Sequence, residues 1–197
     1  MKIVLQDEVW EGPKVKGSRF IGYILHVETL ETIKNKLHEI QLEHPQSSHV
    51  CYAWILEGEG ERFSDDGEPR GSAGKPILQH LKGKKITNVL AVSVRYYGGT
   101  KLGFGGLIRA YGNSISSVLE KVQLTDYMKY ALIQFQYEYA LRSNVQRVCS
   151  NHSDLCMHID HQFTEQITTT IQTPLNRVAD LREFLKDSCN GKINFLI

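Results

Sequence analysis

The chain has 197 residues, of which 41% are hydrophobic and 23% charged, and its formal net charge is +1 at pH 7. This balance fits a globular protein with one large or two small domains, and it excludes a disordered or fibrous chain. The charge is unevenly spread, because residues 1–61 sum to −4 and residues 62–109 to +6. The central segment therefore favours polyanions or acidic protein surfaces as partners.

The expected compartment follows from what the sequence lacks. No apolar run approaches the ~20 residues that span a bilayer, and the first residues have no apolar core typical of a secretory signal. The four cysteines, Cys51, Cys149, Cys156 and Cys189, include no Cys-x-x-Cys pair. Reduced thiols are usual for such cysteines in the cytoplasm. We therefore expect a cytoplasmic protein that makes no membrane contact.

The first part of the chain predicts alternating strands and helices. Residues 1–17 are expected to form a leader that adds one edge strand, while residues 18–27 and 49–56 have the β-branched and aromatic content of strands. Between them, Thr29 suits the N-cap of a helix that ends before Pro45. The apolar face of this helix consists of Leu30, Ile33, Leu37 and Ile40.

Residues 62–76, the acidic loop, follow the second strand. The Asp-Gly and Glu-Pro pairs and three glycines predict a loop without regular structure. Asp65, Asp66 and Glu68 could hold a hard cation or act as acid and base. We favour a loop-ordering role for these acids, through turn chemistry or by pairing with arginine. The candidate arginine partners are Arg62, Arg70 and Arg95.

A helix, a strand and a second loop come next. Pro76 fits the first turn of a helix that ends at Gly83. The apolar residues 89–94 predict a buried strand, and apolar spacing from Leu107 to Val122 predicts a helix. Residues 95–109 between them, the glycine loop, contain five glycines from position 98 to 106.

The glycine loop brings backbone amides to a helix N-terminus, where anions are favoured. We expect a phosphate-binding surface, although a turn that merely packs against the sheet is the alternative. Tyr96 and Tyr97 add the prospect of stacking on an unpaired base, with packing under the loop expected for one of them. The residues assigned to nucleic-acid or phosphate binding are Arg70, Lys75, Arg95, Lys101, Gly103, Gly105, Gly106 and Arg109.

Two domains are expected, 1–124 and 127–197, joined by a linker at Leu124–Asp126. The first is an α/β layer of three strand-helix units. The second predicts strands at 130–139, 155–163 and 166–173, helices near 141–148 and after Pro174, and a last strand at 192–197. This strand-helix-strand-strand-helix-strand order is typical of a ferredoxin-like domain.

Two further clusters contain side chains that are capable of chemistry. His49 and Cys51 lie two apart on a strand and could form a nucleophile pair, although packing is the usual role of such a cysteine. Cys156, His158 and Asp160 could bind zinc, but no second pair at zinc spacing supports this. We expect no catalytic residue, no metal site and no cofactor.

Several motifs occur together in a fixed order. They are Ser-Arg-Phe at 18–20, His-Val-Cys-Tyr-Ala at 49–53, and the stretches 62–69, 71–76 and 95–111. Over roughly residues 15–123 they resemble the IMPACT/YigZ family. The remainder resembles the small C-terminal domain of its bacterial members.

The resemblance implies a first domain like the second domain of the fifth small-subunit ribosomal protein. It implies a second domain like the ferredoxin-type domains of elongation factor G. Eukaryotic members restrain the kinase that senses uncharged transfer RNA, by competing for its activator. We find no counterpart of their separate N-terminal interaction domain, so that role is not expected here.

The preferred hypothesis is a translation-associated regulator that binds RNA or the ribosome through the glycine loop. A translation-related protein partner stays open, as does the oligomeric state. One alternative is a hydrolase acting on a phosphorylated or peptide substrate through the acidic loop. The other alternative is a regulator that acts by protein interaction alone.

Overall fold

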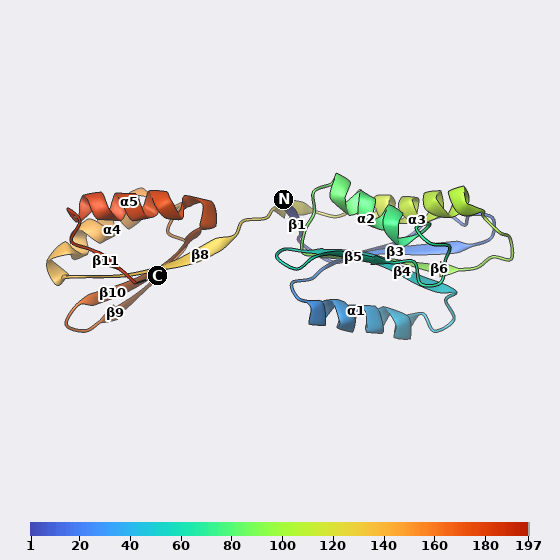
Figure 1. Cartoon of the computed structure of the whole chain (residues 1–197), viewed down its shortest axis with the longest axis horizontal. Helices are drawn as coiled ribbons and strands as arrows, with labels where there is room; N and C mark the ends of the chain where they lie inside the picture. The colour runs from blue at the N-terminus through green and yellow to red at the C-terminus, as the bar shows by residue number, and fades with distance from the viewer. Residues whose placement is uncertain (197) are drawn as a thin grey trace. The chain divides into compact units, whose positions relative to one another are not determined.

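The computed structural model describes residues 1–196. The chain divides into two compact units, Met1–Tyr127 and Met128–Ile197 (Figure 1). Each unit has its own hydrophobic core. The chain passes from one unit to the other through Tyr127–Lys129, which has no regular structure. No helix in the described part of the chain is both long and apolar enough to cross a bilayer.

The first unit contains three helices and seven strands. The elements are β1 (Lys2–Val4), β2 (Glu8–Glu11), β3 (Arg19–His26), α1 (Leu30–Glu43), β4 (His49–Leu56), β5 (Gly60–Ser64), α2 (Gly74–Gly83), β6 (Val89–Tyr96), α3 (Phe104–Leu119) and β7 (Leu124–Asp126). Strands β3, β4 and β6 and helix α1 confirm the elements expected from the sequence, and Thr29 Oγ1 caps α1 by accepting from the Thr32 amide at 3.1 Å.

Five of these strands form one sheet in the order β2-β3-β6-β4-β5, with every neighbouring pair antiparallel. The mixed α and β composition is confirmed. Strands β3 and β4, which α1 connects, are not neighbours, because β6 lies between them and pairs antiparallel with both. The sheet is therefore antiparallel, unlike the parallel sheet that α/β layers usually contain.

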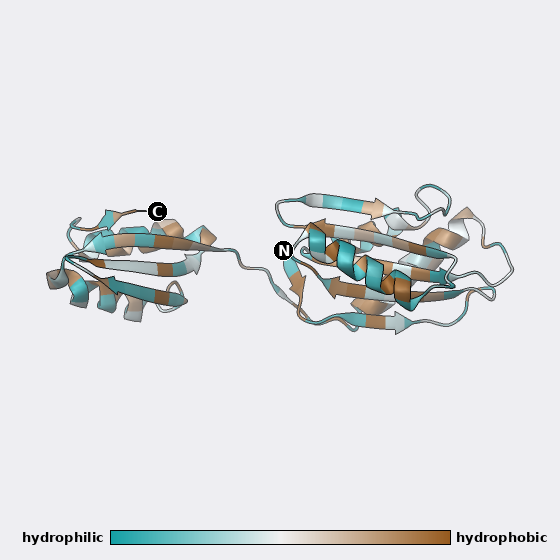
Figure 2. Ribbon diagram, turned by 90° about the horizontal axis from the view of Figure 1, so that it is seen from below, coloured by the Kyte–Doolittle hydropathy of each residue, from teal (hydrophilic) through white to brown (hydrophobic). Residues whose placement is uncertain are grey.

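Helices cover both faces of this sheet. Alternate residues of β6 point to opposite faces, so Val89 and Ala91 pack with α2 and α3 while Leu90 and Val92 pack with α1. Figure 1 shows α1 on one side of the sheet and α2 and α3 on the other. Figure 2 shows α1 crossing the sheet with its hydrophilic residues turned outward.

Three sequence-based expectations are wrong in this unit. The acidic loop is not wholly irregular, because Arg62–Ser64 belongs to β5, which pairs with β4. Leu124–Asp126 is not a linker but strand β7, paired with β1 near the start of the chain. Two edge segments of the first unit, β1 and β2, replace the single one expected in residues 1–17.

The second unit has the expected β-α-β-β-α-β order of elements. The elements are β8 (Tyr130–Tyr137), α4 (Arg142–Asn151), β9 (His158–Phe163), β10 (Ile167–Pro174), α5 (Val178–Ser188) and β11 (Asn194–Phe195). The antiparallel sheet of this unit has the strand order β11-β8-β10-β9, and α4 and α5 share one core with it.

Candidate functional site

The two unusual loops of the first unit meet at a buried ion pair. Glu68 of the acidic loop accepts at Oε1 from Nη1 of Arg95 (2.5 Å) and from the hydroxyl of Tyr111 (2.7 Å). The side chains of Glu68 and Arg95 are only 4% and 6% exposed. The pair therefore joins the acidic loop to the end of β6 and to the first half of α3.

Arg95 was expected to be a phosphate-binding cation, and its position argues against that role. It lies on β6 opposite His49, with alternation directing its side chain toward α2 and α3. There its charge is compensated by Glu68, and Nη2 donates to Ser18 Oγ at 3.4 Å. A buried cation with a carboxylate partner is a structural element that leaves little net charge for phosphate.

Asp65 connects the acidic loop to the start of α2. Its Oδ1 accepts from the amides of Ala73 (3.0 Å) and Gly74 (2.8 Å), and its Oδ2 from the amide of Gly71 (2.7 Å). Ala73, the N-cap residue of α2, has no side chain that could bond these amides. Asp65, eight residues earlier in the sequence, provides the acceptor oxygens instead. The N-terminus of α2 is consequently occupied by a protein carboxylate.

Asp66 fixes the other side of the acidic loop. Its Oδ2 accepts from the Val50 amide at 2.6 Å, and its carbonyl accepts from Nδ1 of His49 at 2.7 Å. Asp66 also has a positive φ of 42°, a conformation that a short polar side chain tolerates best. Both oxygens of Asp65, Oδ2 of Asp66 and Oε1 of Glu68 are thus bonded within the fold, which is the geometry that a loop-ordering role requires.

The glycine loop approaches the start of β3 closely. Gly98 donates its amide to Ser18 Oγ at 3.1 Å, and a Cβ on Gly98 would lie 1.9 Å from the carbonyl carbon of Gly17. Any side chain at Gly98 would displace this contact. Close packing, the alternative weighed for the glycines, therefore explains Gly98.

The N-terminus of α3 differs from that of α2. Gly103, the N-cap, has a φ of +74° and provides no side-chain hydrogen bond. Phe104, Gly105 and Gly106 form the first turn, whose amides have no preceding helical carbonyls to bond. These amides are available to solvent or to an anionic ligand.

Two hollows flank this helix start. The larger, which we call the loop hollow, measures about 510 Å³, and a neighbouring hollow between α2 and α3 measures about 320 Å³. Phe104 borders both and is 55% exposed. The loop hollow is lined by His49, Glu68, Pro69, Arg95, Tyr97, Lys101, Leu102, Gly103, Phe104 and Leu107.

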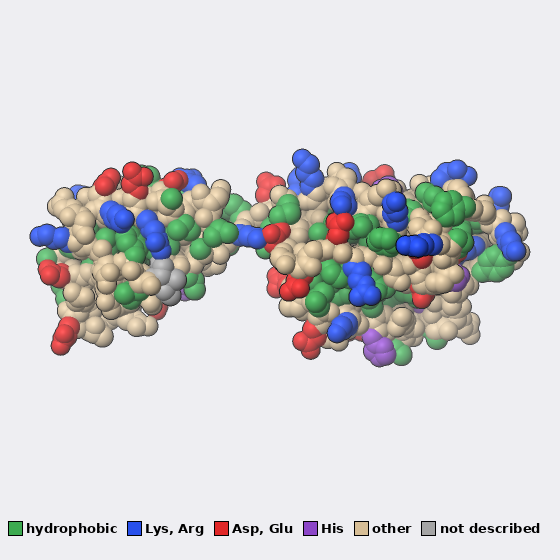
Figure 3. Space-filling view, viewed as in Figure 1, with side chains coloured by type: hydrophobic (Ala, Val, Ile, Leu, Met, Phe, Trp, Pro, Cys, Tyr) green, Lys and Arg blue, Asp and Glu red, His purple; other side chains and the backbone are tan. Residues whose placement is uncertain are grey.

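The remaining predicted cations are exposed and surround this region without forming one cleft. Lys101 lines the loop hollow, while Arg70 and Lys75 line the neighbouring hollow. Arg109 lines neither hollow, but its Nη1 lies 3.7 Å from the position of a Cβ on Gly105, beside the first turn. Figure 3 shows Lys and Arg side chains around exposed apolar ones on the α2 and α3 side of this unit.

Comparison with known proteins identifies the family. Residues 16–119 match the family model of the Impact N-terminal domain. Over 189 residues the chain is 34% identical to IMPACT family member YigZ of Escherichia coli (strain K12), covering 93% of this chain and 91% of that protein. The chain belongs to the IMPACT family.

Other relatives agree with this assignment. Identity to IMPACT family member YvyE of Bacillus subtilis (strain 168) is 29% over 181 residues, covering 90% of this chain and 82% of that protein. The crystal structure of a hypothetical protein, 30% identical, covers 99% of this chain and 95% of its own with a TM-score of 0.69. The similarity to these two proteins thus extends over both units.

His49 and Cys51 do not form a nucleophile pair in this family member. Cys51 is fully buried, and its thiol donates to the Asp65 carbonyl at 3.0 Å. Burial raises the pKa of Cys51 to about 12, so the reactive thiolate is scarce at neutral pH. Cys51 packs in the core, which was the alternative interpretation.

The possible zinc cluster in the second unit is likewise not assembled. Within the described residues, no group of three or more His, Cys, Asp or Glu side chains is placed to hold a metal ion. Cys156 lies before β9, in contact with the core that α4 and α5 share with the sheet.

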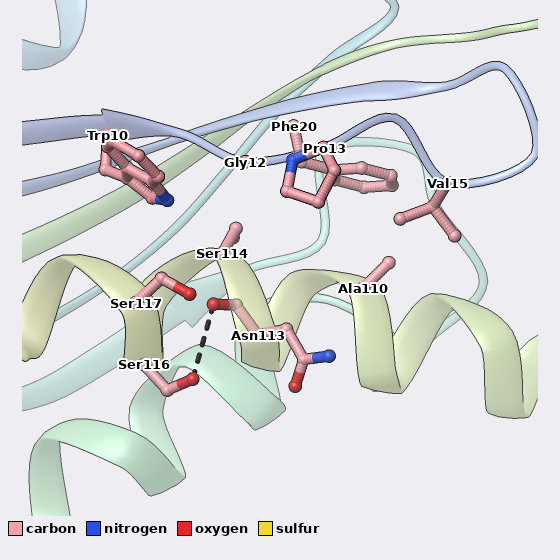
Figure 4. Close-up of a pocket in the computed structure, with 10 residues that line it drawn as sticks. All are labelled: Trp10, Gly12, Pro13, Val15, Phe20, Ala110, Asn113, Ser114, Ser116 and Ser117. Atoms are coloured by element: carbon pink, nitrogen blue, oxygen red, sulfur yellow. Dashed lines mark hydrogen bonds between the residues drawn. The ribbon is translucent and has the colours of Figure 1, made fainter.

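A separate hollow of about 360 Å³ lies between β2, the start of β3 and α3 (Figure 4). Trp10, Pro13 and Phe20 form its apolar side, while Ser116 and Ser117 face it from α3. None of the described residues that line this hollow has a charged side chain. It therefore lacks the features expected of a phosphate site and includes none of the predicted binding residues.

Proposed function

We propose that this IMPACT family member is a translation-associated regulator that binds RNA, free or within the ribosome, through the surface around the start of α3. Membership of the family supports a role in translation control, because the resemblance implies such a role for its eukaryotic members. The binding surface consists of Arg70, Lys75, Lys101, Arg109 and the first turn of α3.

One observation carries the proposal. Four exposed cations and an uncapped helix N-terminus surround Phe104, a large apolar side chain that the fold leaves 55% exposed. Arginine, lysine and helix N-termini are the groups that contact nucleic-acid phosphates. An exposed aromatic ring among them offers a stacking surface to an unpaired base.

The fold supports the ribosome as the place of action. We propose that the first unit resembles the second domain of the fifth small-subunit ribosomal protein and that the second resembles the ferredoxin-type domains of elongation factor G. The β-α-β-β-α-β order of the second unit and its strand order β11-β8-β10-β9 agree with the latter. Fold likeness alone does not establish function, so the charged surface is the stronger support.

A hydrolase that uses the acidic loop is less well supported. Asp65 accepts three backbone amides and Glu68 is paired with Arg95. General acid or base catalysis requires a carboxylate within reach of a substrate proton. Asp65 and Asp66 are engaged by the fold, which favours a structural role for them.

The test is binding of a structured RNA over a series of salt concentrations. Neutralising about four phosphates gives a logarithmic slope of about −3 to −4, at ~0.7 to 0.9 per phosphate. Lys101→Ala should weaken binding to all sequences alike and reduce the slope by about one unit. Lys34→Ala is the matched control, because Lys34 is also exposed but lies on α1, against the opposite face of the sheet. A flat salt response, or the same slope in Lys101→Ala and the parent protein, would favour protein interaction instead.

A further inference from the structure

The loop hollow combines apolar walls with a polar end. Tyr97 and Phe104, exposed by 48% and 55%, line it together with Pro69, Leu102 and Leu107. Tyr96, by contrast, packs on the α1 side, with its hydroxyl 2.8 Å from His44 Nδ1. Of the two adjacent tyrosines, only Tyr97 therefore offers a surface for stacking.

The polar end contains the buried ion pair, and this pair is not fully satisfied. Glu68 Oε1 accepts from Arg95 and Tyr111, but no described residue donates to Glu68 Oε2. Arg95 Nε is buried and also has no hydrogen-bond partner among the described residues. Glu68 lines the loop hollow, so the open acceptor at its Oε2 is available to a ligand in the hollow or to water.

The carboxylate also limits which ligand can enter. An ionised carboxylate only accepts hydrogen bonds, and because Arg95 and Glu68 compensate each other, the interior offers a phosphate no net positive charge. A neutral, flat group with an N–H donor is therefore suited to the interior. A phosphate is suited to the rim, where Lys101 and the first turn of α3 provide positive charge.

A nucleotide meets both conditions at once. We propose that the loop hollow binds one unpaired nucleobase with an exocyclic amino group, which donates to Glu68 Oε2, while the adjoining phosphate lies at the start of α3. This inference rests on the proposed RNA-binding function and adds a base preference to it. Adenine, cytosine and guanine carry such a group, whereas the only N–H of uracil lies between two carbonyl oxygens that a carboxylate repels.

The test uses three oligouridylates of nine nucleotides that differ only at the central position. One carries adenosine, one carries purine riboside, which lacks the amino group, and one carries an abasic residue. The adenosine oligonucleotide should bind more tightly than the purine riboside one by a factor of about ten or greater, because the purine riboside cannot donate the hydrogen bond to the charged carboxylate. The abasic one should be weaker again, by about fivefold to a hundredfold, the effect of losing one stacked base.

Two variants locate the effect. Tyr97→Ala and Phe104→Ala should reduce the difference between the adenosine and abasic oligonucleotides, and both side chains are exposed, so the fold should tolerate the change. Phe163→Ala is the matched control, because Phe163 is 52% exposed but belongs to the second unit. It should leave all three affinities unchanged.

The outcomes separate the two proposals. Equal affinities for the three oligonucleotides, with a steep salt dependence, would overturn the base site and leave RNA binding standing. No binding of any oligonucleotide at low salt would overturn both. A difference that persists in Phe104→Ala and Tyr97→Ala would place the base elsewhere and overturn the assignment to the loop hollow.

Discussion

Replacing Arg95 by methionine is expected to lower the free energy of unfolding of the first unit by about 3–5 kcal/mol, the usual cost of removing one partner of a buried ion pair. Glu68 would then be a buried carboxylate whose main remaining partner is the Tyr111 hydroxyl. The loss should appear chiefly as a shift of the urea midpoint, since the surface exposed on unfolding changes little.

Tryptophan fluorescence isolates this effect. Trp10 and Trp54 are the two tryptophans of the chain, and both belong to the first unit. Lys101→Met is the matched control for removing an exposed cation, and it should change stability by less than about 0.5 kcal/mol. The double variant Arg95→Met/Glu68→Gln should recover part of the loss, because the uncompensated charge is gone. A cost for Arg95→Met no larger than that of the control would contradict the structural role of Arg95.

Asp65→Asn is expected to destabilise the first unit by about 2–3 kcal/mol, in the range of hydrogen bonds to charged groups. The side-chain amide of asparagine keeps only one acceptor oxygen. Its NH₂ group takes the place of the other oxygen and faces a backbone N–H that has lost its acceptor. The affected amides are those of Gly71, Ala73 and Gly74, so hydrogen exchange should accelerate at these three positions.

The control for Asp65 makes the same chemical change at an exposed position. Glu59→Gln, in the turn between β4 and β5, should leave stability and exchange unchanged. Calorimetry provides a second check, since an acidic loop that serves the fold should bind neither magnesium nor manganese. Heat of metal binding in the parent protein that disappears in Asp65→Asn would instead favour the hydrolase hypothesis.

Local patterns in the sequence predicted most elements of the first unit, because apolar periodicity and capping residues act over a few positions. Strand β5 was missed, since Gly60–Ser64 is mostly exposed on both faces and lacks the alternation that marks a strand. The β1–β7 pairing was missed because it joins segments near Lys2 and Asp126, and no local signal connects positions so distant. The strand order could not be read from the sequence either. It places β6 between β3 and β4, a pairing of distant segments for which the sequence contains no local signal.

The candidate site was predicted less completely than the fold. The glycine loop and its cations were identified, but Arg95 was counted among the free cations although strand alternation with Ala91 and Ser93 directs it toward α2 and α3. Phe104 was overlooked, since composition does not show whether an aromatic between glycines is covered. The open oxygen of Glu68 depends on three-dimensional neighbours and has no sequence signature.

Ultraviolet crosslinking of the full chain to RNA, followed by peptide mapping, tests the central claim most directly. Trypsin cleavage after Arg95, Lys101 and Arg109 releases the glycine loop as two peptides, 96–101 and 102–109. These contain Tyr97 and Phe104, and we predict that the principal crosslinks fall within them. Crosslinks confined to residues 128–197 or to α1, with none in the two loop peptides, would contradict RNA binding at the start of α3.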